Sequence, residues 1–195
     1  MDIFKILSIA LGAVLTNNFV FAQLLGVCPF VGASRKVETA AGMGMSVTLV
    51  MGAASAVTWL VNEYVLVKFD LLYLRTVVFV LIIAALVQLL EMLLQKWMPE
   101  LHRALDIYLP LITANCAVLG VTVLNVAQSY SLLESVFHGV TGGLGFLLAI
   151  VLLAAIRERL AFSDAPETWK GLPLALVSAG LMVLAFMGFS GLRIW

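Results

Sequence analysis

The chain has 195 residues, of which 63% are hydrophobic and 11% are charged, and its formal net charge is zero. Soluble domains carry about 25% charged residues, so this composition excludes a soluble domain and indicates a membrane protein. The balanced charge provides no basic surface of the kind that binds nucleic acid. The first residues, M-D-I-F-K-I-L, lack the features of a cleaved signal peptide, so we interpret the first apolar run as a permanent span.

Six apolar runs are long enough to cross a membrane as helices, which takes about 20 mostly apolar residues. In chain order they are residues 3–30, 40–61, 71–94, 105–126, 132–156 and 172–192. The connections between them are short. Residues 1–195 are therefore predicted to form one all-α integral membrane domain of six transmembrane helices, without a second domain.

The lysines and arginines between the runs predict the orientation, because cytoplasmic loops carry an excess of them. The loops after the first, third and fifth runs contain Arg35, Lys36, Lys96, Arg103, Arg157, Arg159 and Lys170. The opposite side contains Lys5, Lys68, Arg75 and Arg193. We therefore expect the first side to be cytoplasmic and both termini to be periplasmic.

Three spans in each half indicate two inverted three-helix repeats, because an odd number of spans places the second half upside down. The sequence T-N-N at residues 16–18 is echoed by T-A-N at residues 113–115, each in the first span of its half. Such repeats usually have their working site near the midplane, at discontinuous helices. Pro29 and Gly32 in the first span, and Pro110 in the fourth, favour broken helices 1 and 4.

The only cysteines are Cys28, in G-V-C-P-F-V-G, and Cys116, in T-A-N-C-A-V-L-G. Their separation from the predicted cytoplasmic charges places both thiols roughly 10–20 Å below that surface. A free cysteine is commonly a small buried hydrophobic residue, and a disulfide is disfavoured near the reducing side. Two thiolates are half of a four-thiolate metal site, so a metal would need further ligands from another chain.

Three asparagines lie in the predicted spans: Asn17, Asn18 and Asn115. They either form hydrogen bonds between helices or cap half-helices around a cofactor or ion path. Asn115 adjoins Cys116, which favours the second interpretation there. Glu91 either contributes to an ion path or is paired near the membrane surface. His102 and His138 are expected in loops or at helix ends, without a partner at metal-ligand spacing.

Glycines predict close approach between helices: Gly42, Gly44, Gly142, Gly143, Gly145, Gly188 and Gly191. The G-x-G patterns follow no strand and are therefore not nucleotide-binding motifs. The chain alone contains no recognisable enzyme active site.

Residues 16–44, T-N-N-F-V-F-A-Q-L-L-G-V-C-P-F-V-G-A-S-R-K-V-E-T-A-A-G-M-G, resemble the start of the A-type subunits of the Rnf complex. Four further segments resemble the same subunits: L-P-L-I-T-A-N-C-A-V-L-G-V, L-A-A-I-R-E-R-L, S-D-A-P and S-A-G-L-M-V-L-A-F-M-G-F-S-G-L. The resemblance covers nearly the whole chain in one register. The D and E subunits of the sodium-pumping NADH:quinone reductase are related and share this plan.

The resemblance implies a membrane subunit of a complex that couples electron transfer between ferredoxin and NAD to translocation of Na⁺ or H⁺. It also implies that Cys28 and Cys116 are two of four ligands of a 2Fe-2S cluster. The homologous RnfE protein, in the opposite orientation, would share this cluster. Asn115 would then lie next to a cluster ligand. The other partners would be RnfB, RnfC, RnfD and RnfG and membrane lipid, in a bacterial inner membrane, and this chain would bind no nucleotide or flavin.

Two alternatives remain open from the residues themselves. One is an ion-conducting membrane subunit whose cysteines are structural, and the other is a scaffold subunit without a redox role. Visible absorption or an electron paramagnetic resonance (EPR) signal in this chain purified together with RnfE would distinguish the first alternative from the cluster hypothesis. The scaffold alternative predicts that cysteine substitutions leave electron transfer intact.

Overall fold

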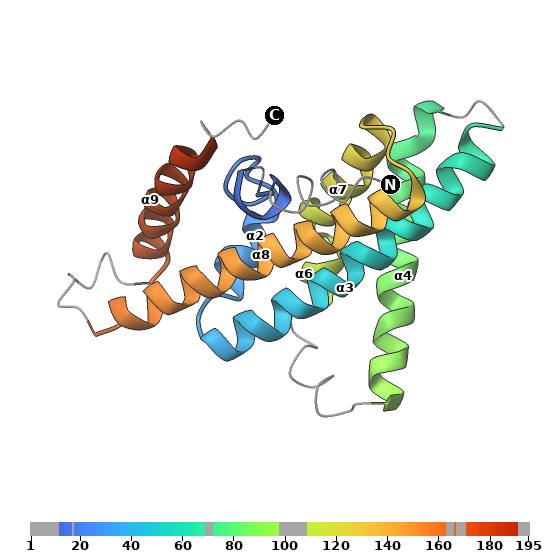
Figure 1. Ribbon diagram of the computed structural model, residues 1–195. Coiled ribbons are helices and arrows are strands. Elements are labelled where there is room, and N and C mark those ends of the chain that lie inside the picture. The colour runs from blue at the N-terminus through green and yellow to red at the C-terminus, as the bar shows by residue number, and fades with distance from the viewer. Residues whose placement is uncertain are drawn as a thin grey trace.

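The computed structural model describes residues 12–16, 18–68, 72–97, 109–162, 166 and 171–190 (Figure 1). Every regular element in these residues is a helix, which confirms the predicted all-α class. The first nine residues of the run at 3–30 and both ends of the chain lie outside the described residues.

Four of the predicted runs correspond to long helices. These are α3 (Val37–Val61), α4 (Arg75–Trp97), α8 (Leu132–Leu160) and α9 (Leu172–Ser190). A π-helical turn, η2 (Asn62–Leu66), extends α3, and a short 3₁₀ turn, η3 (Leu72–Leu74), precedes α4. Three segments are long and apolar enough to cross a membrane, namely Val37–Leu66, Arg75–Met92 and Leu132–Leu160. The count of six spans stays a prediction.

The first and fourth runs are broken, as predicted. In the first, η1 (Gly12–Thr16) is separated from α2 (Val27–Gly32) by turns. In the fourth, residues 114 and 115 separate α6 (Leu109–Thr113) from α7 (Cys116–Ala127). Each half of the chain therefore has one discontinuous helix, whereas the inverted relation of the halves stays a prediction.

The helices α3 and α8 lie antiparallel, side by side, through the middle of the molecule (Figure 1). Glycines allow this close approach. A Cβ added at Gly143 would lie 2.5 Å from Thr48 Cα, and one added at Gly139 would lie 2.8 Å from the Met51 carbonyl oxygen. Since real Cβ atoms do not approach backbone so closely, only glycine fits at these positions.

The predicted glycine contacts are only partly correct. A Cβ would meet close neighbours at Gly44, Gly142, Gly143 and Gly145. At Gly42 and Gly188 it would meet nothing within 4 Å, so no close approach occurs there among the described residues, and Gly191 lies outside these.

The broken first segment packs against the centre of α8. Asn18 Nδ2 donates to the Gly145 carbonyl at 2.9 Å, and the buried Phe19 ring lies over Gly142. On the other side of this segment, the rings of Phe21 and of Phe186 in α9 stack with centroids 4.3 Å apart. The break is therefore held between two helices.

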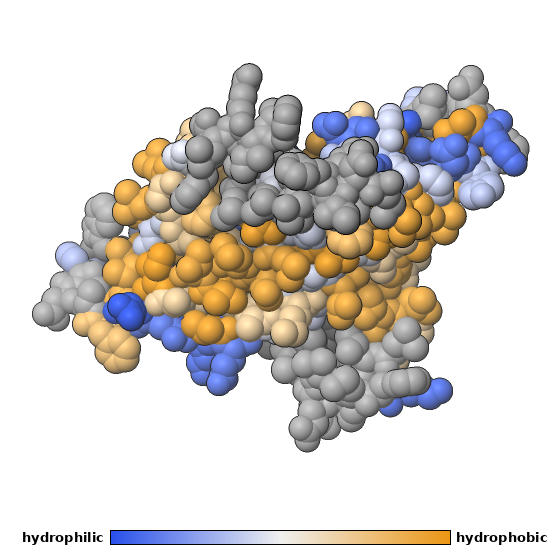
Figure 2. Space-filling view, in the orientation of Figure 1, coloured by the Kyte–Doolittle hydropathy of each residue, from blue (hydrophilic) through white to orange (hydrophobic). Residues whose placement is uncertain are grey.

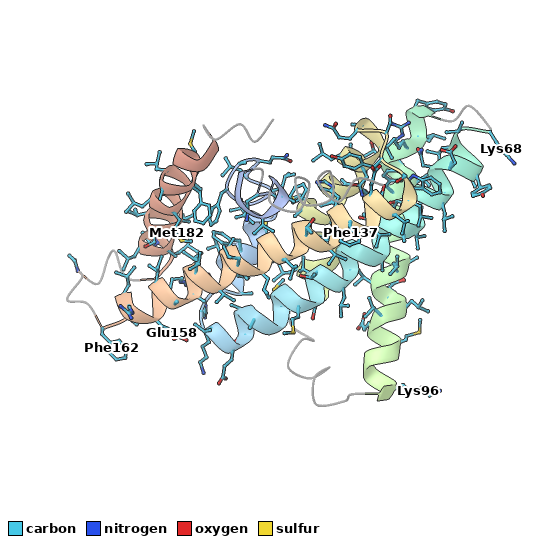
Figure 3. The ribbon with its side chains drawn as sticks, in the orientation of Figure 1. Lys68, Lys96, Phe137, Glu158, Phe162 and Met182 are labelled. Atoms are coloured by element: carbon cyan, nitrogen blue, oxygen red, sulfur yellow. The ribbon has the colours of Figure 1, made fainter. Side chains whose placement is uncertain are left out.

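The outer surface of α8 carries an exposed apolar stripe: Leu133, Phe137, Val140, Leu144, Leu148 and Leu152. Figure 2 shows apolar residues along the face formed by α3 and α8, with hydrophilic residues gathered toward its ends. In Figure 3, Lys68 lies beyond one end of this pair of helices and Glu158 near the other. Such an apolar band between charged ends is the surface that a bilayer or a membrane partner covers.

Candidate functional site

The two cysteines occupy the first turns of the helices that follow the two breaks. Cys28 is the second residue of α2, and Cys116 is the first residue of α7. The Gly26 N–H donates to the Sγ of Cys116 at 2.9 Å. This hydrogen bond connects the start of α2 to the start of α7, so the structure brings the two thiol-bearing segments together.

Both thiols lie on the surface of the chain. Cys28 and Cys116 are free and exposed, although cysteine is among the residue types most often buried. Within this chain, the two cysteines are therefore not buried hydrophobic residues. Their side chains are available to a ligand or partner outside this chain.

Gly26 holds the junction between the two segments. Its φ of 78° lies in the left-handed region, which glycine adopts without steric cost. An added Cβ would lie 3.1 Å from Ala117 Cβ, Asn115 Oδ1 and Phe146 Cε2. The backbone conformation therefore favours glycine, and a larger residue would also have to displace these neighbours. The Gly26 N–H lies against the Cys116 sulfur.

Asn115 caps the half-helix that begins with Cys116. Its Oδ1 accepts a hydrogen bond from the Ala117 N–H at 3.0 Å, as an N-cap residue does. Only 3% of Asn115 is exposed, and its Nδ2 has no hydrogen-bond partner among the described residues. The predicted cap is confirmed, and a cofactor or ion path around it stays a prediction. The cap leaves one buried amide donor on the residue before Cys116.

The prolines do not mark the breaks themselves. Pro29 is the third residue of α2 and Pro110 is the second residue of α6, where a missing N–H removes no intrahelical hydrogen bond. The second break lies at residues 114–115, four residues beyond Pro110, where Asn115 starts a new helix. The asparagine cap, rather than the proline, determines where this span is interrupted.

The other predicted polar residues have different surroundings. Asn18 is fully paired, because Nδ2 donates to two carbonyls and Oδ1 accepts from the Val20 N–H. Its role is hydrogen bonding between the break and α8. Glu91 is half-buried on α4, and nothing in its surroundings tests an ion-path role. Asn17 and His102 lie outside the described residues.

The sequence predicts His138 in a loop or at a helix end, and it instead lies in the second turn of α8. Its Nδ1 is 2.6 Å from Asn125 Oδ1 of α7. Its ring makes edge contacts with Phe19 and Tyr130. The sequence does not predict this pair, because the two residues come from different helices. The one sequence feature that could have indicated such a contact is Asn125 itself, a polar residue within the apolar run of α7.

A metal site complete within one chain is not present in the described residues. They contain no group of three or more His, Cys, Asp or Glu side chains able to hold a metal ion. Cys28 and Cys116 are exposed, the Gly26 hydrogen bond joins the segments that carry them, and two thiols equal half of the four-thiolate set that an iron–sulfur cluster takes. They fit an iron–sulfur centre that a second chain completes.

Comparison with known proteins gives one consistent family. Residues 6–193 match the model of the Rnf-Nqr subunit, a membrane protein. The chain is 54% identical to the A subunit of the Na⁺-translocating ferredoxin:NAD⁺ oxidoreductase complex of Acetobacterium woodii, over 95% of this chain and 97% of that protein.

Two further relatives agree. The chain is 57% identical to the A subunit of the ion-translocating oxidoreductase complex of Pectobacterium carotovorum, over 91% of this chain and 92% of the relative. It is 54% identical to the protein of the same name from Syntrophotalea carbinolica, over 96% of this chain and 97% of that protein. The chain therefore belongs to the Rnf-Nqr family of membrane subunits.

Proposed function

We propose that this chain is the RnfA component of an ion-translocating ferredoxin:NAD⁺ oxidoreductase complex. Cys28 and Cys116 provide two of the four thiolate ligands of a 2Fe-2S cluster, and the homologous RnfE protein, in the opposite orientation, provides the other two. The observation that carries this proposal is the 2.9 Å hydrogen bond from Gly26 to Cys116, which joins the two cysteine-bearing helix starts at the surface.

The exposure of both thiols supports a shared site. A structural cysteine gains most from burial among apolar neighbours. In this chain the residues just beside the thiols, Ala117 and Pro29, are buried, whereas the thiols themselves are exposed. This arrangement leaves two sulfur ligands at the surface, where a partner chain can complete the coordination.

The surroundings of Cys116 suit a thiolate. The sulfur lies at the N-terminus of α7, where the helix dipole favours negative charge. It accepts a hydrogen bond from the Gly26 N–H, and the side-chain amide of the preceding residue, Asn115, has a buried donor without a partner among the described residues. When bound, a 2Fe-2S cluster takes up and releases single electrons, and hydrogen bonds to its sulfurs help to set its reduction potential.

The complex-level activity follows from the names of the relatives. The Acetobacterium relative is named for Na⁺ translocation and for ferredoxin and NAD⁺, and the others for ion translocation. We accordingly assign this chain to electron transfer coupled to Na⁺ or H⁺ movement in a bacterial inner membrane, together with RnfB, RnfC, RnfD and RnfG. Both termini are proposed to be periplasmic.

The test is replacement of each ligand in the assembled complex. Cys28→Ser and Cys116→Ser should remove the cluster's EPR signal and ferredoxin–NAD⁺ electron transfer, because a serine oxygen is a harder and poorer ligand for iron than sulfur. The complex should still assemble, since one serine costs little in a span of about twenty apolar residues.

Val27→Ser and Ala114→Ser are matched controls, because each adds a hydroxyl beside one cysteine and removes no thiol. Both controls should keep the signal and the activity. If the two cysteine variants assemble and retain both, the ligand assignment is wrong and the cysteines have another role.

A further inference from the structure

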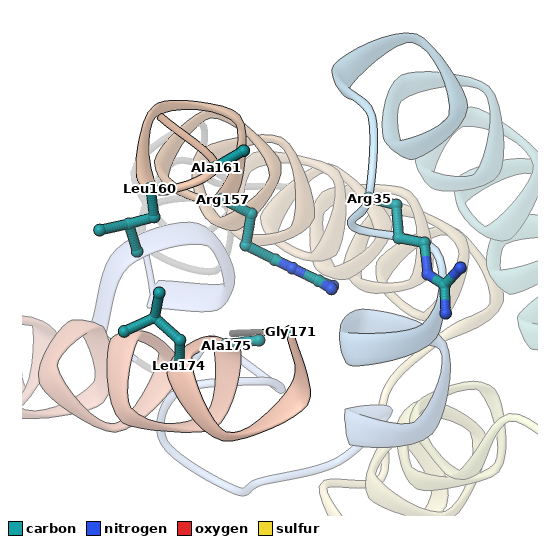
Figure 4. Close-up of a pocket in the computed structure, with 7 residues that line it drawn as sticks. All are labelled: Arg35, Arg157, Leu160, Ala161, Gly171, Leu174 and Ala175. Carbon is teal, nitrogen blue, oxygen red and sulfur yellow. The ribbon is translucent and has the colours of Figure 1, made fainter. Parts of the chain in front are cut away.

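A cavity of about 330 Å³ lies at the C-terminal end of α8, and neither cysteine lines it (Figure 4). The bend between α2 and α3, the end of α8 and the start of α9 enclose it. Its lining residues are Arg35, Arg157, Leu160, Ala161, Gly171, Leu174 and Ala175. Two walls are therefore guanidinium groups, and the others are small or apolar side chains.

The two arginines give the cavity a strong positive charge. Arg157 is half-buried and is held in place, because its Nη1 donates to the Val31 carbonyl and to Ser34 Oγ, both at 2.8 Å. Arg35 is exposed, and its guanidinium is seen across the cavity from that of Arg157 in Figure 4. No carboxylate of the described residues lines the cavity. Two like charges facing one space favour an anion between them.

The start of α9 adds to this positive potential. Gly171, Leu174 and Ala175 line the cavity, and the Ala175 N–H makes the hydrogen bond to the Gly171 carbonyl that opens this 19-residue helix. The N-terminal turn of a helix carries partial positive charge and favours anions. The cavity thus combines two guanidiniums with a helix N-terminus, a set of groups that suits phosphate.

The apolar part of the lining distinguishes a lipid from a free ion. Leu160 and Leu174 form walls of the cavity, and the outer face of α9 continues from them with Leu172 and Leu176, which are 61% and 50% exposed. Basic pockets between membrane helices on the cytoplasmic side bind phosphate-bearing lipid headgroups. We infer that this cavity binds the phosphate of an anionic phospholipid, whose acyl chains lie along the apolar face of α9.

Photochemical cross-linking in the assembled complex tests this inference. The probes are phosphatidylglycerol and phosphatidylcholine, each with a photoreactive acyl chain, and the readout is the yield of lipid adducts on residues 171–190. Wild type should favour phosphatidylglycerol. Arg35→Gln should lower that yield about tenfold, the size of effect expected when one charge-assisted hydrogen bond is lost.

Arg159→Gln is the matched control, because it makes the same change in charge on an exposed residue that does not line the cavity. It should leave the yield unchanged. Arg35 is the better test than Arg157, because Arg157 also holds the α2 turn through Val31 and Ser34.

Three results would overturn the inference. Equal losses in Arg35→Gln and Arg159→Gln would indicate general surface charge. Competition by millimolar inorganic phosphate would indicate a site for a free anion. Adducts that form on the isolated full-length chain but not in the assembled complex would indicate that a neighbouring protein of the complex covers the cavity.

Discussion

At the scale of single residues, the geometry of the thiol pair depends on Gly26 and Asn115. Gly26 supplies the N–H that reaches Cys116, and its own Cβ position is filled by neighbouring atoms at 3.1 Å. Asn115 starts the helix that carries Cys116 at its first position. Each residue therefore acts on the site through backbone geometry, without providing a ligand.

Replacement of Gly26, compared with replacement of another left-handed glycine, should distinguish backbone strain from the loss of the contact with the Cys116 segment. Gly26→Ala forces an L-residue into the left-handed region, at about 1–2 kcal/mol, and also displaces Ala117, Asn115 or Phe146. We expect reduced stability and loss of most of the cluster signal. Gly171→Ala is the control, because φ is +94° there and the added Cβ meets nothing within 4 Å. Gly171→Ala should reduce stability to a similar or smaller extent and leave the EPR signal of the cluster intact. Equal EPR signals in the two variants would show that the Gly26 contact is unimportant for the cluster. The measurements are thermal unfolding in detergent and EPR.

Asn115 should respond differently to two substitutions. Asn115→Ala loses the cap, worth about 1 kcal/mol, whereas Asn115→Ser keeps a capping oxygen. Both lose the buried Nδ2 donor. We expect lower stability only in the alanine variant but a lower reduction potential in both, because a donor near sulfur stabilises the more negative reduced state. Potentiometric titration followed by EPR measures this, and an unchanged potential in the serine variant would exclude Nδ2 as a donor to the cluster.

At the scale of elements, the closely packed pair of helices α3 and α8 supports the break in the first span. The two helices approach closely because glycine occurs where a side chain would meet backbone, as at Gly143 opposite Thr48. The first break then packs on α8 through Phe19 and Asn18. The position of the cysteines thus depends on helix packing far from them in sequence.

Gly143→Ala tests this close packing. Its Cβ would lie 2.5 Å from Thr48 Cα, so the helices must separate, at about 1–3 kcal/mol. Gly180→Ala is the matched control on α9, where the Cβ meets nothing within 4 Å and alanine gains about 0.5–1 kcal/mol of helix propensity. Denaturant unfolding in detergent should show destabilisation for Gly143→Ala only, and equal stability of the two variants would contradict close packing of α3 on α8.

The long helices could be predicted from sequence, because a run of about twenty apolar residues is a local property. The existence of both breaks could also be predicted, but their positions could not. The first break contains left-handed Leu24 and Gly26, and Gly26 packs against distant segments. The sequence therefore does not show that Cys28 and Cys116 each lie in the first turn after a break. The contact between His138 and Asn125 was missed for the same reason, since it joins two helices.

At the scale of the whole molecule, we assign to this chain half of a shared metal centre, and its described residues hold no group of three or more metal-ligating side chains. Two exposed thiols in a protein with an extended apolar surface suit a membrane partner that provides the remaining ligands. The central claim is therefore that the cluster belongs to a pair of homologous proteins and to neither alone.

The most direct measurement is the iron and sulfide content, with the EPR spectrum, of the purified chain alone and of the chain purified together with RnfE. We predict about two iron atoms per pair of proteins, as a four-thiolate 2Fe-2S cluster requires, and no bound cluster in the chain alone. Within the pair, Cys28→Ser or Cys116→Ser should reduce the iron content to background. A stoichiometric cluster in the isolated chain, or an unchanged iron content in both serine variants of the pair, would contradict the shared-cluster assignment.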